Sequence, residues 1–309
     1  MNQITAAALP LALMAVFFVV PVYIIHWLRK RYRRDRRSPL TEKLLRGAGQ
    51  TLRLELDRVE DDLSNQLAIL LVMPFMMFSV YLSQSYFGGA RESVFRLGLT
   101  AAIASAAAAF IARKLYLLSR RKFILRCGLE AEVAMGEELG HLMRRGAVVF
   151  HDFPAEQFNI DHVVLTAGGV YAVETKGRMK PDKGRGKLDA TVEFDGRILI
   201  FPDWRDTKTV EQATRQAVWL ANWISKAVGR PIGVKAVVAL PGWWVERSGR
   251  GNAMVISGKE ARHLLKPWQD ELFTEQMMIQ IAHQLEQRCR DVEPTQYGRQ
   301  EGLIARAAQ

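Results

Sequence analysis

Three apolar stretches dominate the N-terminal part of the chain. Residues 4–25 and 67–87 carry no charged side chain. About 20 consecutive apolar residues cross a bilayer as a helix, and both stretches reach that length. The third stretch, residues 97–118, reaches it when Arg113 and Lys114 extend their charged ends toward the lipid interface. The pattern therefore predicts three transmembrane helices.

These stretches divide the N-terminal part into a first span, residues 1–28, and a hairpin of two spans, residues 67–118. A signal peptide is the alternative for the first stretch. Signal peptides carry their basic residues before the apolar run, whereas here they follow it, at 29–37. A buried alanine-rich helix is the alternative for the third stretch. A span is favoured there because without it the rest of the chain would lie outside the cell.

The segment between the first two spans, residues 29–66, begins with a basic run and is patterned as one helix over 40–66. Its apolar residues recur at steps of seven, four and three: Leu45, Leu52, Leu56, Val59 and Leu63. This stripe suits either a helix lying on the membrane or a short coiled coil. The expected partners are therefore the lipid bilayer and a second copy of the chain, joined through residues 45–63 and the spans.

The charge distribution orients the spans. The formal net charge is +11, and residues 1–127 supply all of it, with 19 Lys and Arg against 8 Asp and Glu. Cytoplasmic loops of membrane proteins are rich in Lys and Arg. Basic segments follow the first and third spans, whereas the link at 88–96 has only Arg91 and Arg96 as basic residues. We expect a multi-pass protein of the inner (cytoplasmic) membrane, with the N-terminus outside and the C-terminal domain in the cytoplasm.

From about residue 126 the pattern changes to mixed helices and strands. It predicts an α/β domain over 126–289, with a mixed central sheet flanked by helices, and a polar tail over 290–309. Helices are expected at 129–143, 208–226, near 258–266 and at 271–289; strands are expected at 147–153, 160–165, 170–175, 234–240 and 253–257, with a hairpin at 191–201.

A second hairpin signal lies in residues 158–177, FNIDHVVLTAGGVYAVETKG, where two apolar strands flank a Gly-Gly pair. A two-residue turn centred on the glycines pairs Asp161 with Lys176. A turn one residue earlier places Asp161 opposite Glu174. Either register puts all three side chains on one face of the sheet, because side chains alternate along strands.

Charged side chains are unexpected in strands this apolar, because buried carboxylates are costly unless a cation compensates them. Two acids and a lysine form the set needed for metal-assisted phosphodiester hydrolysis. The carboxylates of Asp161 and Glu174 would hold Mg²⁺ or Mn²⁺, and Lys176 would orient water or stabilise developing charge. Glu132, at the edge of the inward face of helix 129–143, is either a third acid of this set or a solvated residue.

Two further features lie around this set. Gln212, in helix 208–226, either hydrogen-bonds a phosphate or metal-bound water or is an exposed flank. The loop at 176–187 suits either a nucleic-acid backbone or solvent. Its candidate backbone contacts are Lys180, Lys183, Arg185 and Lys187. A phosphate-binding loop of the Walker type is absent from the sequence, which argues against an ATP motor.

The order of motifs resembles the nuclease-related domain (NERD) family: G-x-x-x-E, N-I-D-H-V-V, G-G-V-Y-A-V-E-T-K-G and V-E-Q-A-T-R-Q. The resemblance covers about residues 126–240 and implies a PD-(D/E)XK nuclease fold. By position, Asp161 matches the motif aspartate, and Glu174 and Lys176 match E-x-K. Glu132 matches the first-helix glutamate and Gln212 the helix glutamine, although the family's G-E pair reads Ala-Glu here.

The expected function is membrane-anchored, Mg²⁺-dependent cleavage of nucleic acid, with DNA as the expected substrate, on the cytoplasmic side. The alternative is a catalytically silent nuclease-fold module that binds or scaffolds at the membrane. The intact Asp, Glu and Lys set favours the enzyme. The zero net charge of residues 128–309, with 24 Lys and Arg against 24 Asp and Glu, favours the scaffold.

Overall fold

A computed structural model describes residues 16, 19–32, 39–40, 42–87 and 94–294. The chain divides into two compact units. Residues 58–121 belong to the first, and Lys43–Asp57 with Lys122–Val292 make up the second. The segment at 43–57, which precedes the second predicted span, is therefore part of the same unit as the predicted α/β domain.

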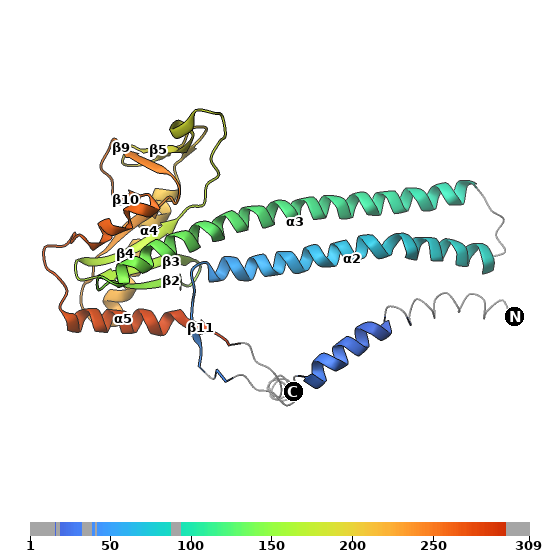
Figure 1. The fold of residues 1–309 in the computed structure, drawn as a ribbon, viewed down its shortest axis with the longest axis horizontal. Coiled ribbons are helices and arrows are strands. Elements are labelled where there is room, and N and C mark those ends of the chain that lie inside the picture. Colours follow the sequence, from blue (N-terminus) through green and yellow to red (C-terminus); the bar gives the residue numbers. More distant parts are fainter. Residues whose placement is uncertain (1–15, 17–18, 33–38, 41, 88–93, 295–309) are drawn as a thin grey trace. The chain divides into compact units, whose positions relative to one another are not determined.

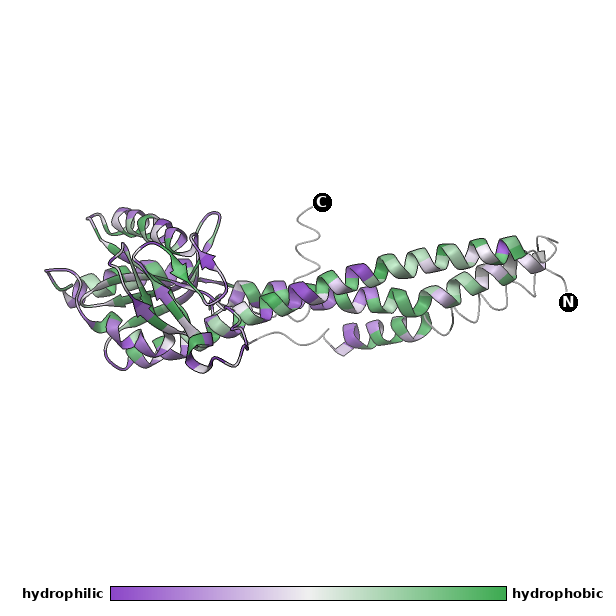
Figure 2. Cartoon of the chain, turned by 90° about the horizontal axis from the view of Figure 1, so that it is seen from above, coloured by the Kyte–Doolittle hydropathy of each residue, from purple (hydrophilic) through white to green (hydrophobic). Residues whose placement is uncertain are grey.

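Two long helices run through the described residues (Figure 1): α2, Gln50–Phe87, and α3, Val94–Met143. By length and composition, each is long and apolar enough to cross a membrane. In α2 and α3, only 0 % and 6 % of the most apolar stretch is buried. In Figure 2, green marks the hydrophobic residues along these two helices. They include the second and third predicted spans. The first, residues 4–25, falls largely outside the described residues, although residues 19–32 are helical.

The predicted helix over 40–66 is wrong in its bounds. Leu44–Leu45 form a short strand, β1, which pairs with β11, Arg290–Val292. Gly49 then takes a φ of +68°, a left-handed conformation that favours glycine and precedes the start of α2. Leu45 is thus lost from the expected apolar stripe. Leu52 of that stripe packs inside the second unit, where a Cβ on Gly128 would lie 3.2 Å from its Cδ1 atom.

The third predicted span and the predicted helix at 129–143 are one continuous helix, because α3 has 50 residues. The segment between them, residues 119–128, contains no proline, and four of its ten residues are Arg or Lys, which favour helix. Glu132 therefore lies on the same helix, α3, as a candidate membrane span.

The centre of the second unit is a five-stranded mixed sheet in the order β10-β8-β4-β3-β2. Neighbours β10–β8 and β8–β4 are parallel, whereas β4–β3 and β3–β2 are antiparallel. The strands are β2, Val148–Pro154; β3, Asn159–Thr166; β4, Gly169–Thr175; β8, Val234–Ala239; and β10, Ala253–Ile256. These are the five predicted strands, and their pairing confirms an α/β fold with a mixed sheet.

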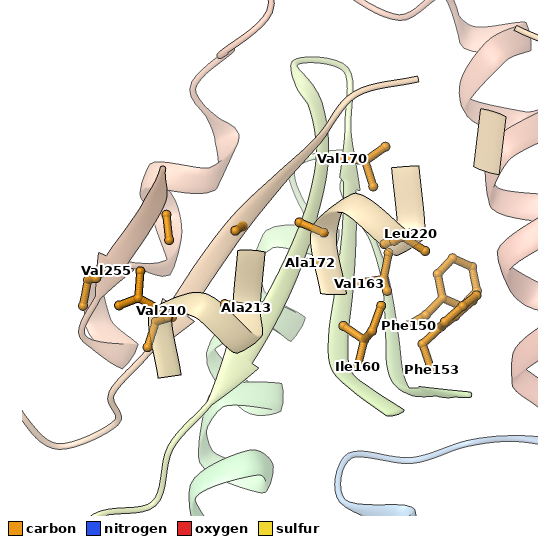
Figure 3. Close-up of a cluster of buried hydrophobic side chains, with 14 of the residues drawn as sticks. Phe150, Phe153, Ile160, Val163, Val170, Ala172, Val210, Ala213, Leu220 and Val255 are labelled. Atoms are coloured by element: carbon orange, nitrogen blue, oxygen red, sulfur yellow. The ribbon is translucent and has the colours of Figure 1, made fainter. Parts of the chain in front are cut away.

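Helices cover both faces of this sheet. One face packs against α4, Thr209–Val228, and α5, Glu275–Cys289, and this cluster is drawn in Figure 3. The other face packs against the last part of α3 and against η2, Gly258–Leu265. The sequence predicts a helix near 258–266, and the structure shows that it is of the 3-10 type. Fully buried Leu139 and Leu220 anchor α3 and α4 to opposite faces. Side chains from α3 and α4 can therefore meet only where the strands end.

A smaller sheet has the strand order β7-β6-β5-β9, and its strands come from segments that lie between strands of the main sheet in the sequence. Its strands are β5, Thr191–Phe194; β6, Leu199–Ile200; β7, Arg205–Asp206; and β9, Trp244–Arg247. The predicted hairpin at 191–201 is confirmed as the β5–β6 pair. The strands β7 and β9 have two and four residues, too few for an alternating pattern to be visible in the sequence.

Candidate active site

The β3–β4 hairpin adopts the second of the two predicted registers. Thr166 pairs with Gly169, so the turn is Ala167-Gly168, and continuing the register places Asp161 opposite Glu174. Packing from a distant segment explains this choice. A Cβ on Gly169 would lie 2.2 Å from Nε1 of Trp268, and only glycine leaves room for that indole.

Glu174 lies at the end of β4 and is 3 % exposed. Its Oε1 atom accepts hydrogen bonds from Lys176 Nζ and, at 2.9 Å, from Gln212 Nε2. Its Oε2 atom accepts one from Gln216 Nε2 at 2.6 Å. Lys176 also donates to Gln212 Oε1 at 3.2 Å. A carboxylate and an ammonium at the end of the sheet are thus held in place by two amides from one face of α4.

Asp161 lies on β3, at the same end of the sheet. Its Oδ2 atom accepts a hydrogen bond from the backbone N–H of Thr175 at 2.6 Å. Burial raises the pKa of Asp161 well above its usual range, and the negative charges of Glu174 and Glu132 raise it further, against the Thr175 N–H and Lys176, which lower it. The site therefore resists carrying all of its carboxylates as anions without a cation.

Glu132 reaches the same site from α3 and is 8 % exposed. The turn before α2 covers it, since a Cβ on Gly49 would lie 3.6 Å from its Oε2 atom. Burial raises the pKa of Glu132 to about 7, and the charges of Asp152 and Glu174 contribute to the rise. Glu132 is thus buried and interacts electrostatically with Glu174 and Asp161, although the three acids come from three elements.

The raised pKa of Glu132 has a consequence for stability. Its folded pKa of about 7 exceeds the reference value of 4.5, so the folded state binds more protons between these values. In chelator, the free energy of unfolding should then fall by up to roughly 3 kcal/mol as pH rises from 4.5 to 7. Glu132→Gln should flatten this fall and be the more stable form at pH 8, as measured by thermal unfolding of the full chain in detergent. A variant less stable than wild type at pH 8 would contradict the placement.

Gln216, one turn after Gln212 on α4, is a second glutamine of this site. It is 3 % exposed, and besides Glu174 its Nε2 atom donates to the carbonyl of Asn159 at 3.3 Å. The helical spacing to Gln212, four residues earlier, was the available signal. Two glutamines on one helical face can donate hydrogen bonds to both oxygens of one carboxylate.

A polar network that the sequence did not reveal joins the segment before α2 and its first turn to β2 and β3. The Asn159 amide donates to Thr51 Oγ1 at 2.6 Å, and Thr51 donates its backbone N–H and its hydroxyl to Asp152 Oδ2 at 2.8 and 2.7 Å. Arg46 Nη1 contacts the same oxygen at 3.0 Å, and the Nε and Nη2 atoms of Arg46 donate to the two carboxylate oxygens of Asp291. The first turn of α2 is thereby tied to the strand that carries Asp161.

The basic loop is largely engaged within the protein. Lys183 Nζ lies 2.5 Å from Asp203 Oδ1, and Arg185 Nε donates to Asp189 Oδ1 at 2.7 Å. Lys180 and Lys187 lie over the rings of Trp243 and Trp244, at 6.0 and 4.8 Å. Two of these four residues are paired with neighbouring acids and two lie over aromatic rings. They therefore do not form one continuous, unpaired cationic surface.

The donor chemistry of the carboxylate cluster, Asp161, Glu174 and Glu132, fits a hard divalent cation, since all three offer carboxylate oxygens. Their ligating atoms do not converge as they stand: in the described part of the chain, no group of three or more His, Cys, Asp or Glu is arranged to hold a metal. The cation that contacts Glu174 is the Lys176 ammonium. Metal binding would therefore require that ion pair to rearrange.

Fold and site together define an α/β domain whose mixed sheet brings an acidic cluster and a lysine to the end of its central strands. Residues 128–241 match the family model of the nuclease-related domain, NERD. This match agrees with the predicted resemblance over about residues 126–240 and includes every residue of the carboxylate cluster. Neither a curated protein nor a solved structure matches the chain.

Proposed function

We propose that the α/β domain is a nuclease of the PD-(D/E)XK type, which hydrolyses phosphodiester bonds of DNA with the help of a divalent cation. The observation that carries the proposal is the grouping of Asp161, Glu174 and Glu132, from β3, β4 and α3, with the ammonium of Lys176. The match to the nuclease-related domain supports it independently. Clustered acids with raised pKa values are typical of functional sites.

Each residue has a role in this proposal. The carboxylate cluster would hold Mg²⁺ or Mn²⁺, which polarises a phosphoryl oxygen and lowers the pKa of bound water. Lys176 is 20 % exposed, so its ammonium can reach the substrate side, orient the attacking water and stabilise charge on the phosphate. Gln212 bonds both Glu174 and Lys176 and would keep the lysine directed at that position.

A catalytically silent binding or scaffolding module is the second candidate, and one observation favours it. Both oxygens of Glu174 are already satisfied by Lys176, Gln212 and Gln216. A buried ion pair with this many donors is complete without a metal. In that case the fold would be retained for binding at the membrane.

Lys176→Met separates the two candidates. In a nuclease, the variant should lose cleavage by about a hundredfold to ten-thousandfold, the range for a positioned proton-transfer or charge-stabilising group. It should bind Mn²⁺ at least as tightly as wild type, because one cation that competes for Glu174 is gone. Cleavage of labelled DNA and calorimetry with Mn²⁺ on the full chain in detergent measure the two effects.

In a silent module the same substitution leaves a buried, unpaired Glu174 and lowers stability, with no response to Mn²⁺ in either protein. Lys226→Met is the matched control, because this exposed lysine lies at the far end of α4 and should change neither cleavage nor Mn²⁺ affinity. A Lys176→Met variant that cleaves DNA as wild type does would contradict the assigned role of the lysine.

We further propose that the chain is a multi-pass protein of the inner membrane, with the N-terminus outside and the second unit in the cytoplasm. The apolar helices α2 and α3 and the basic segments at 29–37 and 113–126 support this orientation. The bilayer is the proposed partner of the exposed apolar faces of α2 and α3. A second copy of the chain, packed along the same helices, is also proposed.

The orientation can be tested by fusing alkaline phosphatase, which is active only outside the cytoplasm, to two positions. A fusion after Val292 should be inactive, because α3 returns the chain to the cytoplasm. A fusion in the link at 88–93 should be active. The reverse pattern, or activity at both positions, would overturn the proposed topology.

A further inference from the structure

An open cavity of about 590 Å³ adjoins the candidate active site. Lys176 and Gln212 form one wall, so the cavity begins at the residues that contact Glu174. The rest of the lining comes from the loop after β4, from β7 and the residues on either side of it, and from the start of α4: Arg178, Trp204, Arg205, Asp206, Thr207, Lys208 and Thr209. Its volume lies in the range of ligand-binding sites, roughly 300–1,000 Å³.

The lining is strongly cationic. Lys176, Arg178, Arg205 and Lys208 face a single acid, Asp206. Arg205 and Lys208 are exposed, and their side chains form no ion pair within the part of the chain that the structure describes. Arg178 Nη2 is held at 3.0 Å from Asp206 Oδ2, which fixes its guanidinium at the cavity. Cations placed beside a phosphodiesterase site favour a phosphate-bearing ligand.

The single acid is already occupied by the protein. Asp206 Oδ1 accepts hydrogen bonds from the backbone N–H groups of Lys208 and Thr209 at 3.0 and 2.9 Å, and Oδ2 accepts one from the Thr209 hydroxyl at 2.8 Å. It therefore caps the start of α4. These N–H groups are not available to a ligand, so an anion in the cavity would be bound by side chains.

An aromatic ring completes the wall. Trp204 lines the cavity and is supported from behind by Phe201, whose ring is stacked on it at 4.4 Å with an interplanar angle of 9°. The rings of Trp204 and Trp243 are nearly perpendicular, with an interplanar angle of 87° and centroids 6.2 Å apart. A tryptophan fixed in this way can offer a flat surface to a nucleobase, and aromatic rings in a basic groove are the usual means of binding single strands.

We infer that this cavity binds one unpaired nucleotide of a single-stranded nucleic acid, with its phosphates on Arg178, Arg205 and Lys208 and its base against Trp204. The inference rests on the proposed nuclease function, because it makes the cavity the subsite next to the phosphate that is cleaved. A base within a duplex is stacked on both faces and would have to be flipped out to reach Trp204. The site therefore selects single strands or frayed ends over duplex DNA.

Binding of a labelled oligothymidylate to the full chain in detergent, followed by anisotropy in chelator, tests the phosphate contacts without catalysis. The double variant Arg205→Ala/Lys208→Ala should weaken binding and lower the slope of log K against log salt by about 1.4, or about 0.7 for each lost contact. Lys226→Ala/Arg230→Ala is the matched control, since it removes one exposed lysine from the last turn of α4 and one exposed arginine just after that helix. An equal loss in both variants would overturn the subsite.

The base contact is tested by combining a protein change with a ligand change. Trp204→Ala should weaken binding of the intact strand by on the order of tenfold, and an abasic strand should bind wild type about as weakly. The two changes together should cost little more than either alone. Trp204→Phe, which keeps a ring against Phe201, should remain near wild type. Independent, additive losses would overturn the contact between the base and Trp204.

Three outcomes distinguish this inference from the proposed function. If the cavity variants cleave DNA with the same KM as wild type, the subsite is overturned and the proposed nuclease function stands. Strand binding that maps to the cavity without any metal-dependent cleavage would support the subsite and overturn the nuclease. Duplex DNA or free thymidine monophosphate that binds as tightly as the single strand would overturn the selection of an unpaired nucleotide in a strand.

Discussion

Asp161→Asn should abolish metal-dependent DNA cleavage while leaving the protein folded. Loss of a residue that only orients a metal ligand costs about tenfold to a hundredfold, so loss of a ligand should cost at least on the order of a hundredfold. The asparagine keeps an oxygen for the Thr175 N–H, which lies 2.6 Å from Asp161 Oδ2 in the wild type. Burial and two neighbouring acids already raise the pKa of Asp161, so a neutral side chain should melt no lower than wild type in chelator.

Cleavage of labelled DNA and thermal unfolding of the full chain in detergent measure these two effects. The control is Asp270→Asn, an exposed aspartate outside the site, which should match wild type in both. An Asp161→Asn variant that cleaves at the wild-type rate would contradict its assignment as a ligand. A variant that unfolds well below wild type in chelator would indicate that the carboxylate has a structural role instead.

Arg46→Ala should lower the free energy of unfolding of the second unit by about 3 kcal/mol. Asp152 is 3 % exposed, and Arg46 is the cation that contacts it, at 3.0 Å. Removing one partner of a buried pair leaves an uncompensated charge, which typically costs 3–5 kcal/mol. The lower end applies because Asp152 keeps both hydrogen bonds from Thr51.

Two further variants make this result specific. Arg53→Ala removes an exposed arginine from the first turn of α2 and should change stability by less than about 0.5 kcal/mol. Adding Asp152→Asn to Arg46→Ala should recover part of the loss, because the buried charge is then absent. If Arg46→Ala is as stable as the Arg53→Ala control, the network does not hold the segment at 43–51 to the domain.

Local sequence signals are sufficient for the part of the site that lies on one hairpin. Alternation along two short strands places Asp161, Glu174 and Lys176 on one face of the sheet, and both possible turns preserve that result. The exact register depends on Trp268, which packs on Gly169 from a segment about a hundred residues away in the chain. No pattern within the hairpin contains that information.

Burial of the third acid could not be derived from its own helix. Periodicity places Glu132 at the edge of a face, and an edge residue is exposed unless something covers it. The covering segment is the turn at Gly49, which lies beyond two apolar helices in sequence and was predicted to be helical. The glycine conformation and the β1–β11 pairing that shape this turn depend on residues at the opposite end of the domain.

The cavity beside Lys176 was missed for a related reason. Its cations come from three separate elements, one of which is the two-residue strand β7. The sequence drew attention to the denser run of charge at 176–187, where Lys183 and Arg185 pair with nearby acids. Charge density along a chain and accessible charge at a site are different quantities, because acids supplied by the fold can neutralise a run of basic residues.

The most direct test of the account is calorimetric titration of the full chain in detergent with Mn²⁺. The carboxylate cluster predicts saturable binding by the wild type, and Asp161→Asn should remove the heat of binding. Glu132→Gln should weaken the binding, and the Asp270→Asn control should bind as wild type does. A wild type that binds no Mn²⁺ at millimolar concentration would contradict the metal centre and leave a nuclease-related fold whose buried Glu174–Lys176 pair is structural.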